Sequence, residues 1–153
     1  MAPRWCCLAV AVSNTLGMGI YTEAIDHLKA AGLRPTRQRL ALARLLFADG
    51  HRHVSAEELF QEARNADIQV SLATIYNTLH QFTGAGLLRE VPVDSGQSYF
   101  DTNVDHHHHF FVPETGTVID IDSEALRLDG PPEPPDGYAV DRIDVVVRLR
   151  KVE

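Results

Sequence analysis

Cysteine is scarce in this chain of 153 residues. The two cysteines, Cys6 and Cys7, are neighbours, and adjacent cysteines rarely pair with each other, so the sequence contains no disulfide framework. A reducing, cytoplasmic compartment is the default for such a chain. No Cys-x-x-Cys pair occurs either, which excludes a structural zinc site of the common thiolate kind.

Long apolar runs are also missing. No window approaches the roughly 20 consecutive apolar residues that a transmembrane helix needs. Residues 5–12, after Arg4, resemble a short signal peptide, but a disordered tail over residues 1–20, or a true start at Met18, is the favoured interpretation.

Charge is unevenly distributed along the chain. Residues 1–91 carry nine Lys/Arg and eight Asp/Glu, whereas residues 92–153 carry five against thirteen, which together give the formal charge of −7. Six basic residues fall in one stretch of 24 residues that contains a single acid: Lys29, Arg34, Arg37, Arg39, Arg44 and Arg52. The asymmetry favours a front half that faces phosphates and an acidic back half with another task.

The front half is expected to begin with three helices. The first is capped by Thr22 and ends at Gly32, and the second opens at Thr36. Residues 51–53 form a connector. Residues 55–58, Ser-Ala-Glu-Glu, form a capping box that starts the third helix.

A fourth helix, capped by Ser71, is followed by a β-hairpin over residues 87–100. Its apolar residues recur at helical spacing: Leu72, Ile75, Leu79 and Phe82. Its other face is small and uncharged: Ala73, Thr74, Tyr76, Asn77, His80 and Gln81. This order is that of a winged helix, whose last helix enters the major groove. An ordinary amphipathic helix with a solvated face is the alternative, but the outward groups suit thymine methyls and base edges.

The back half reads as a small α/β unit. We expect strands at residues 117–121 and 143–149, a helix from Ser123 to Leu128, and a rigid loop at residues 130–135. One helix and about three strands are too few to bury both faces of a sheet, which predicts a homodimer. The predicted fold is therefore α+β, with a winged-helix DNA-binding domain over residues 21–101 and an α/β dimerisation domain over residues 102–153.

Four consecutive histidines, residues 106–109, lie in a predicted strand of the back half. Because side chains alternate and residues i and i+2 lie about 7 Å apart, the run offers two chelating pairs on opposite faces. Acids lie nearby: Asp101, Asp105, Asp120, Asp122 and Glu124. Imidazole with carboxylate suits zinc, iron or manganese. A tag remnant or a solvated patch is less consistent with an internal run between β-formers, while His27 and His80 read as lone surface positions.

These motifs resemble the ferric uptake regulator superfamily. The similarity rests on residues 32–39 (Gly-Leu-Arg-Pro-Thr-Arg-Gln-Arg), 53–59 (His-Val-Ser-Ala-Glu-Glu-Leu) and 71–79 (Ser-Leu-Ala-Thr-Ile-Tyr-Asn-Thr-Leu). It extends over roughly residues 21–151. Within the superfamily, residues 99–103, the histidines followed by two aromatics, and the ending 141–150 are most similar to Irr, the iron response regulators of alphaproteobacteria.

The resemblance implies a homodimeric repressor or activator of iron and haem genes that binds double-stranded DNA. It implies these DNA-contacting residues: Arg37 and Arg39 at phosphates, Tyr76 and Asn77 at bases, with Ser71, Ala73 and Thr74 beside them. It also implies a divalent metal (Fe, Mn or Zn) that bridges the two domains through His53, Asp101, His107 and His109. We assign His106, His108 and Glu124 to a second metal-binding face, on the other side of the histidine strand.

Three departures from the family bear on the ligand. The paired Cys-x-x-Cys positions fall on Val112 and Thr115, so that structural zinc is absent. The interval between Phe100 and Gly116 is one residue shorter than in the family, so the alignment of the histidines depends on the reference residue. Alignment from Gly116 places His107 and His109 at the bridging positions. Alignment from Phe100 places His108 and Phe110 there, and phenylalanine cannot bind a metal. Some Irr proteins bind haem at an N-terminal Cys-Pro motif, but no proline follows Cys6 or Cys7 here. Haem would instead take an axial imidazole from the histidine run. The haem candidates are His107, His108 and His109.

Other functions remain as alternatives. The first is a divalent-metal-activated repressor of the same superfamily that senses iron, manganese or peroxide. The second is a metal-dependent hydrolase, but the chain has no Gly-rich phosphate loop and no nucleophile motif, so we expect no enzyme. Metal storage alone would not require the capped fourth helix.

Overall fold

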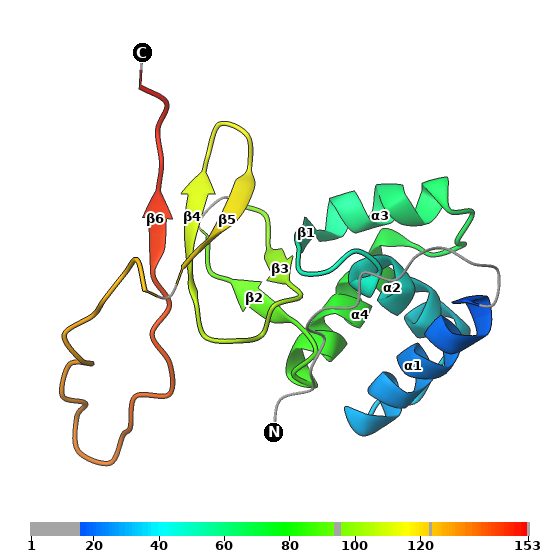
Figure 1. Cartoon of the computed structure of the whole chain (residues 1–153), viewed down its shortest axis with the longest axis horizontal. Helices are drawn as coiled ribbons and strands as arrows, with labels where there is room; N and C mark the ends of the chain where they lie inside the picture. The colour runs from blue at the N-terminus through cyan, green and yellow to red at the C-terminus, as the bar shows by residue number, and fades with distance from the viewer. Residues whose placement is uncertain (1–15, 94–95, 123, 153) are drawn as a thin grey trace. The chain divides into compact units, whose positions relative to one another are not determined.

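The structure is a computed structural model that describes residues 16–93, 96–122 and 124–152, with side chains from residue 22 onward (Figure 1). The chain divides into two compact units. The first unit runs up to Arg89 and includes Phe100–Val104, and the second holds Glu90–Tyr99 and the chain from Asp105 onward. No described helix is long and apolar enough to cross a membrane.

The first unit contains four helices and a short strand. They are α1 (Leu16–Ala30), α2 (Arg37–Phe47), β1 (His53–Ser55), α3 (Ala56–Asn65) and α4 (Leu72–Gly84). The predicted N-caps Ser55 and Ser71 are confirmed, and Thr36, predicted to open the second helix, also caps it: the side-chain oxygen of each accepts a hydrogen bond from the backbone N–H three residues on. Ser55 and Glu58 form the full capping box.

Three predictions for the first unit differ from the structure in detail. Thr22 is not the N-cap of the first helix, because α1 already begins at Leu16. The tail expected over residues 1–20 therefore lies outside the described residues up to residue 15 and belongs to α1 from residue 16. The connector at residues 51–53 ends in a strand, because His53 starts β1.

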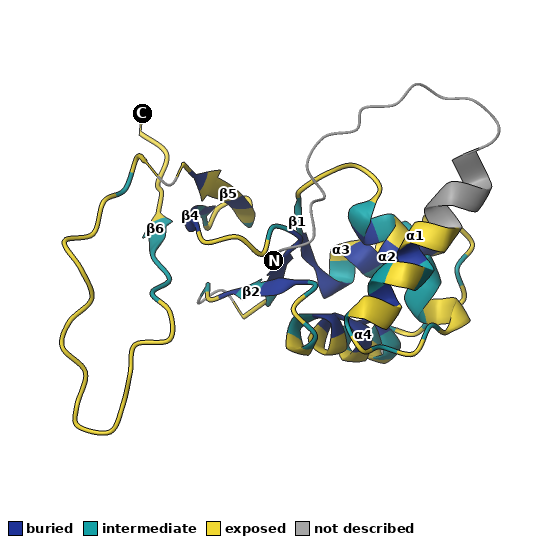
Figure 2. Cartoon of the chain, turned by 60° about the horizontal axis from the view of Figure 1, so that its bottom comes forward, coloured by how far each residue is buried: buried dark blue, intermediate teal, exposed yellow. Residues whose placement is uncertain are grey.

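The core of the first unit lies between its helices. Figure 2 shows their buried faces turned toward one another. The fully buried side chains include Leu42, Leu46, Val54, Leu59, Ile75, Leu79, Phe82 and Phe100. The inward face predicted for α4 is confirmed at Ile75, Leu79 and Phe82, so the opposite face of α4 is the one left to solvent.

The hairpin that follows α4 is also present. It consists of β2 (Arg89–Val91) and β3 (Tyr99–Asp101), and β1 joins it in a sheet of order β1-β3-β2. Residues 94 and 95 of the predicted turn lie outside the described residues. Helices followed by this small sheet confirm the winged-helix order.

The second unit has its own sheet, of order β5-β4-β6. Strands β4 (His108–Val112) and β5 (Thr117–Ile121) are antiparallel, and β6 (Val146–Arg148) runs parallel to β4. One face is covered by a cluster of Val91, Tyr99, Phe111 and Val118. The strand expected at residues 117–121 is confirmed, and the one expected at 143–149 is shorter.

The helix predicted from Ser123 to Leu128 is wrong where it can be assessed. Ser123 lies outside the described residues, residues 124 and 125 form a turn in which the Ala125 N–H donates to the Asp122 carbonyl, and residues 126–128 have no regular structure. Leu126 and Leu128 are two residues apart, a spacing that gives a helix no apolar face. The chain from residue 129 to 142 is exposed and has no regular structure (Figures 1 and 2).

Candidate metal centre and DNA-reading helix

Two imidazoles and a carboxylate converge within the second unit. Register pairs His109 in β4 with Asp120 in β5, and His107, two residues earlier, lies on the same side. The Nε2 atoms of His107 and His109 lie 3.2 and 3.6 Å from Asp120 Oδ1, and the two imidazole rings are 4.5 Å apart. Both histidines are buried. The three ligand atoms lie within 4.8 Å of one another, the spacing of a metal-binding set.

A backbone contact sets the proton position on His107. Its Nδ1 lies 2.8 Å from the carbonyl oxygen of Asp105, which can only accept a hydrogen bond. In the neutral ring the proton therefore sits on Nδ1, and Nε2 presents a lone pair toward Asp120. This second hydrogen bond is the usual way in which proteins orient a metal-binding histidine.

The other two histidines form a separate pair. The rings of His106 and His108 are 5.2 Å apart, which agrees with the alternation predicted for the run, although only His108 lies in β4. His108 Nδ1 accepts a hydrogen bond from the Val145 N–H, and His106 is exposed. Among the described residues, no group of three potential ligands includes His106, His108 or Glu124. The structure does not assemble the predicted second face.

The first unit supplies a further histidine and carboxylate. His53 in β1 and Asp101 in β3 lie on neighbouring strands, with His53 Nε2 3.4 Å from Asp101 Oδ2. The Asp101 side chain is fully buried, and its Oδ1 accepts a hydrogen bond of 2.7 Å from the Asn103 N–H.

Backbone hydrogen bonds between their neighbours hold these two residues in place. The Arg52 N–H donates to Thr102 Oγ1 at 2.8 Å, and the Thr102 N–H donates to the Arg52 carbonyl at 3.0 Å. The Arg52 guanidinium also donates to both carboxylate oxygens of Glu62 in α3. We call these two hydrogen bonds between Arg52 and Thr102, one to the Thr102 hydroxyl and one between the backbones, the Arg52–Thr102 clasp.

Asp120 is the candidate ligand that sequence reasoning underrated. It was noted only as an acid near the histidines and was not assigned as a ligand. The signal was available: pairing Val112 with Thr117 across the predicted turn places His109 opposite Asp120.

The outward face of α4 presents the residues predicted to read DNA. Ala73 and Asn77 are exposed and Tyr76 is half-buried. The hydroxyls of Ser71 and Thr74 lie 2.8 Å apart at the helix start, where Ser71 also caps the helix. Part of their hydrogen-bonding capacity is thus used in forming the helix end.

Arg37 and Arg39, both predicted to contact phosphates, have different surroundings. Arg37 is exposed at the start of α2. The Arg39 guanidinium donates from Nε and Nη2 to Gln81 Oε1 and from Nη1 to the Arg34 carbonyl. Arg39 therefore ties the start of α2 to the exposed side of α4, a role that the sequence alone did not indicate.

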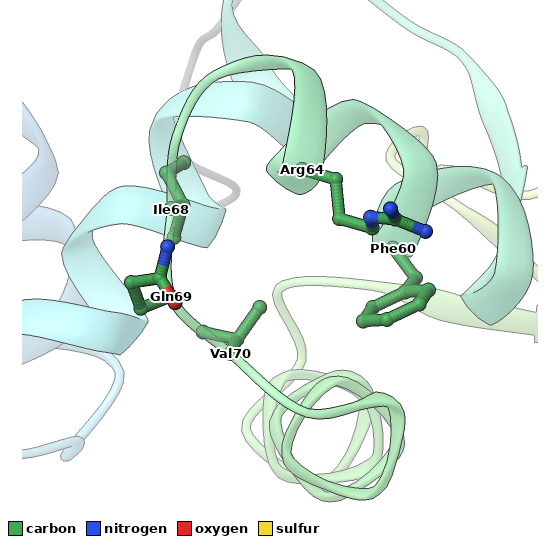
Figure 3. Close-up of a pocket in the computed structure, with 5 residues that line it drawn as sticks. All are labelled: Phe60, Arg64, Ile68, Gln69 and Val70. Carbon is green, nitrogen blue, oxygen red and sulfur yellow. The ribbon is translucent and has the colours of Figure 1, made fainter.

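A surface hollow of about 260 Å³ lies between α3 and the start of α4 (Figure 3). It is lined by Phe60, Arg64, Ile68, Gln69 and Val70, with the Arg64 guanidinium 5.9 Å from the centre of the Phe60 ring. It contains no histidine, cysteine or carboxylate, so its lining has no metal-binding chemistry.

Hydrogen bonds close the turn at residues 112–117, where the resemblance would place family cysteines. Thr115 Oγ1 lies 2.7 Å from Thr117 Oγ1, and the Gly116 N–H donates to the Val112 carbonyl at 2.9 Å. Gly116 has φ +66°, and a Cβ there would lie 2.6 Å from the Tyr99 hydroxyl. Glycine is required by both the backbone angle and the close contact.

A winged helix together with a small sheet that carries buried imidazoles and a carboxylate defines a metal-responsive DNA-binding regulator. The chain belongs to the ferric uptake regulator family, whose family model matches residues 30–130. The predicted fold class and superfamily are thereby confirmed. The two units correspond in kind to the DNA-binding and dimerisation domains of this family.

Relatives of known function agree with this assignment. The chain is 36% identical over 105 residues to the peroxide-responsive repressor PerR of Staphylococcus aureus, covering 69% of this chain and 70% of that protein. It is 34% identical over 108 residues to the ferric uptake regulation protein of Klebsiella pneumoniae, covering 70% of each. These relatives are transcription regulators, in agreement with the expectation of no enzyme.

Solved structures give the same result. The ferric uptake regulator of Pseudomonas aeruginosa with manganese is 28% identical, with a TM-score of 0.63 over 84% of this chain and 97% of that one. A zinc-bound manganese uptake regulator is 25% identical, with a TM-score of 0.61 over 87% of this chain and 99% of that one.

Proposed function

We propose that this chain is a homodimeric repressor or activator of metal homeostasis genes, and that one divalent cation controls its binding to DNA. The observation that carries the proposal is the convergence of His107, His109 and Asp120 on one face of the second unit. His53 and Asp101 form a matching pair in the first unit. We propose that both sets serve one centre, with Asp120 added to the four predicted ligands.

The donor set fits a first-row divalent metal. Three imidazole nitrogens and two carboxylates suit Fe²⁺, Mn²⁺ or Zn²⁺, whereas a Cu⁺ site would favour sulfur. Bound there, the cation would supply a cross-link between the units. The residues of each unit would then fix the angle at which the winged helix is presented, and only some angles fit two operator half-sites.

Dimerisation is proposed through the second face of the β5-β4-β6 sheet. Register places Phe110 beside Ile119 and Val147 on the side opposite the Phe111 cluster. Ile119 is 46% exposed, and Phe110 and Val147 are half-buried. A second copy of the chain would cover this apolar face, and the dimer would match a two-fold operator. We place this activity in the cytoplasm, where regulators of the ferric uptake regulator family bind DNA.

A second candidate is an Irr-like response in which haem ends DNA binding. It is favoured by the three neighbouring histidines and by the threonine turn that replaces a thiolate zinc site. Haem would take an axial imidazole from His107, His108 or His109. Because His107 and His109 also belong to the proposed cation centre, haem and cation would compete for the same nitrogens.

One titration series separates these functions. A duplex selected by the full-length protein from a random pool is titrated with apoprotein, and Mn²⁺, Fe²⁺ and haem are then added separately. Cation control predicts that affinity rises with Mn²⁺ or Fe²⁺ and falls on chelation. Haem control predicts release by haem with a shifted Soret band. A His107→Ala, His109→Ala variant should lose the response, and His106→Ala is the matched control. Binding that ignores all three ligands would contradict both functions.

A further inference from the structure

The hydroxyl of Tyr76, on the outward face of α4, is already engaged by a neighbouring helix. Its proton is donated to Glu57 Oε1 at 2.8 Å. Glu57 is the second residue of α3, and both side chains are half-buried. An acidic residue of α3 thus stands beside the residue of α4 that is predicted to read bases.

The ring of Tyr76 has a neighbour within α4 as well. It stacks on His80 one turn later in α4, with ring centres 6.4 Å apart and planes 24° apart. His80 in turn meets the edge of Phe100 at 5.6 Å, and Phe100 is fully buried in the core of the same unit. The direction of the phenol is therefore fixed by two contacts before any DNA is present.

This arrangement sets the hydrogen-bonding character of the pair. A phenol has one hydrogen, and Tyr76 gives it to Glu57, whose ionised carboxylate has none. The oxygens of both side chains can then only accept hydrogen bonds. The hydrogen bond to Glu57, together with burial and the negative charge, raises the pKa of Tyr76 above 10.0, so the phenol stays protonated at neutral pH.

In the major groove, amino groups are donated by adenine N6 and cytosine N4, whereas thymine O4 and guanine O6 and N7 accept. We propose that Glu57 is a specificity-determining residue, which restricts Tyr76 to accepting and so selects adenine or cytosine on the contacted strand. The inference rests on the proposed function, because it presumes that α4 reads DNA. A thymine or guanine at that position would place its own acceptor atom against the Tyr76 oxygen, and no hydrogen bond could form.

The charge of Glu57 supports a role in discrimination rather than affinity. A carboxylate close to phosphates weakens binding to every sequence by electrostatic repulsion. Such a residue improves selectivity by rejecting wrong partners at a general loss of affinity.

The test is a selection from random duplex DNA with full-length, Mn²⁺-loaded protein, comparing wild type, Glu57→Gln and Glu23→Gln. Glutamine can donate to the phenol oxygen and free its hydrogen for DNA. We expect Glu57→Gln to relax the preference for an amino-bearing base at one position of each half-site by about tenfold. Its affinity for non-operator DNA should rise. Glu23 in α1 is exposed, and its substitution removes the same charge without changing base preference.

A second variant guards against misfolding as the cause. Tyr76→Phe leaves Glu57 in place and should weaken the same base preference, while thermal unfolding confirms that each variant is folded. A base preference unchanged in both variants would overturn the inference and leave the proposed function standing. Failure of the wild-type protein to select any sequence would instead remove the proposed function, and the inference with it.

Discussion

His109 and Asp120 face each other across β4 and β5, with His109 Nε2 3.6 Å from Asp120 Oδ1. His109 is almost fully buried, whereas the Asp120 side chain is 39% exposed. A buried nitrogen is thus paired with a carboxylate that solvent can still reach. Asp120 is therefore the member of the pair that a substitution can change without disturbing the buried core.

We predict that Asp120→Asn lowers Mn²⁺ affinity by about tenfold to a hundredfold, because the amide lacks the charge of the carboxylate while keeping its shape. The measurement is competition with a chelator of known affinity. Asp122→Asn, two residues away and exposed, is the control and should change little. Equal affinities for the two variants would exclude Asp120 from the centre.

The Arg52–Thr102 clasp should affect metal affinity without touching the metal. Thr102→Val removes the hydroxyl that accepts from the Arg52 N–H, which should cost about 1 kcal/mol of the free energy of unfolding. We also expect weaker Mn²⁺ binding, because His53 and Asp101 each adjoin the clasp. Thr102→Ser restores the hydroxyl and should recover both properties; a serine variant as weak as valine would contradict this explanation.

The pKa of Tyr76 predicts a pH dependence at the alkaline end. A folded-state pKa raised above 10.0 stabilises the fold fully below pH 10, and this contribution is lost as the pH rises through the folded pKa. Ultraviolet difference titration of wild type against Tyr76→Phe should show one tyrosine that ionises above pH 10. Glu57→Gln should lower that pKa. A Tyr76 that ionises below pH 10 would contradict the hydrogen bond to Glu57.

Substitution by alanine should change the free energy of unfolding differently at two glycines. Gly116→Ala combines a positive φ with a clash against Tyr99 and should lower the free energy of unfolding by about 2 kcal/mol. Gly84 ends α4 without a positive φ and with open space around it, so Gly84→Ala should be neutral or stabilising by up to about 1 kcal/mol. Denaturant unfolding of both variants measures the difference.

Local signals in the sequence were sufficient for much of the first unit. Caps at Thr36, Ser55 and Ser71 and the inward face of α4 depend on residues three or four positions apart, so pattern alone predicts them. The start of α1 was missed because Thr22 is an acceptable cap within a segment that remains helical on both sides. In the second unit, Ser123 suggests a helix through Leu128, but the segment that follows it has no apolar face at helical spacing to stabilise one.

The candidate site was predicted in part. The alternation of the histidines follows from strand geometry and was expected from sequence. The contacts of Arg39 with Gln81 and of Tyr76 with Glu57 join residues 42 and 19 positions apart in different helices. Such contacts depend on how helices pack, which periodicity within one helix does not reveal.

The threonine-closed turn at residues 112–117 has a consequence for oxidative chemistry. Peroxide oxidises cysteine thiolates to sulfenic and higher acids. The described part of this chain contains no cysteine, and hydroxyl and backbone hydrogen bonds close the turn instead. In the described part of the second unit an oxidant therefore finds no thiol to attack, and the hydrogen bonds that close this turn do not depend on the redox state of sulfur.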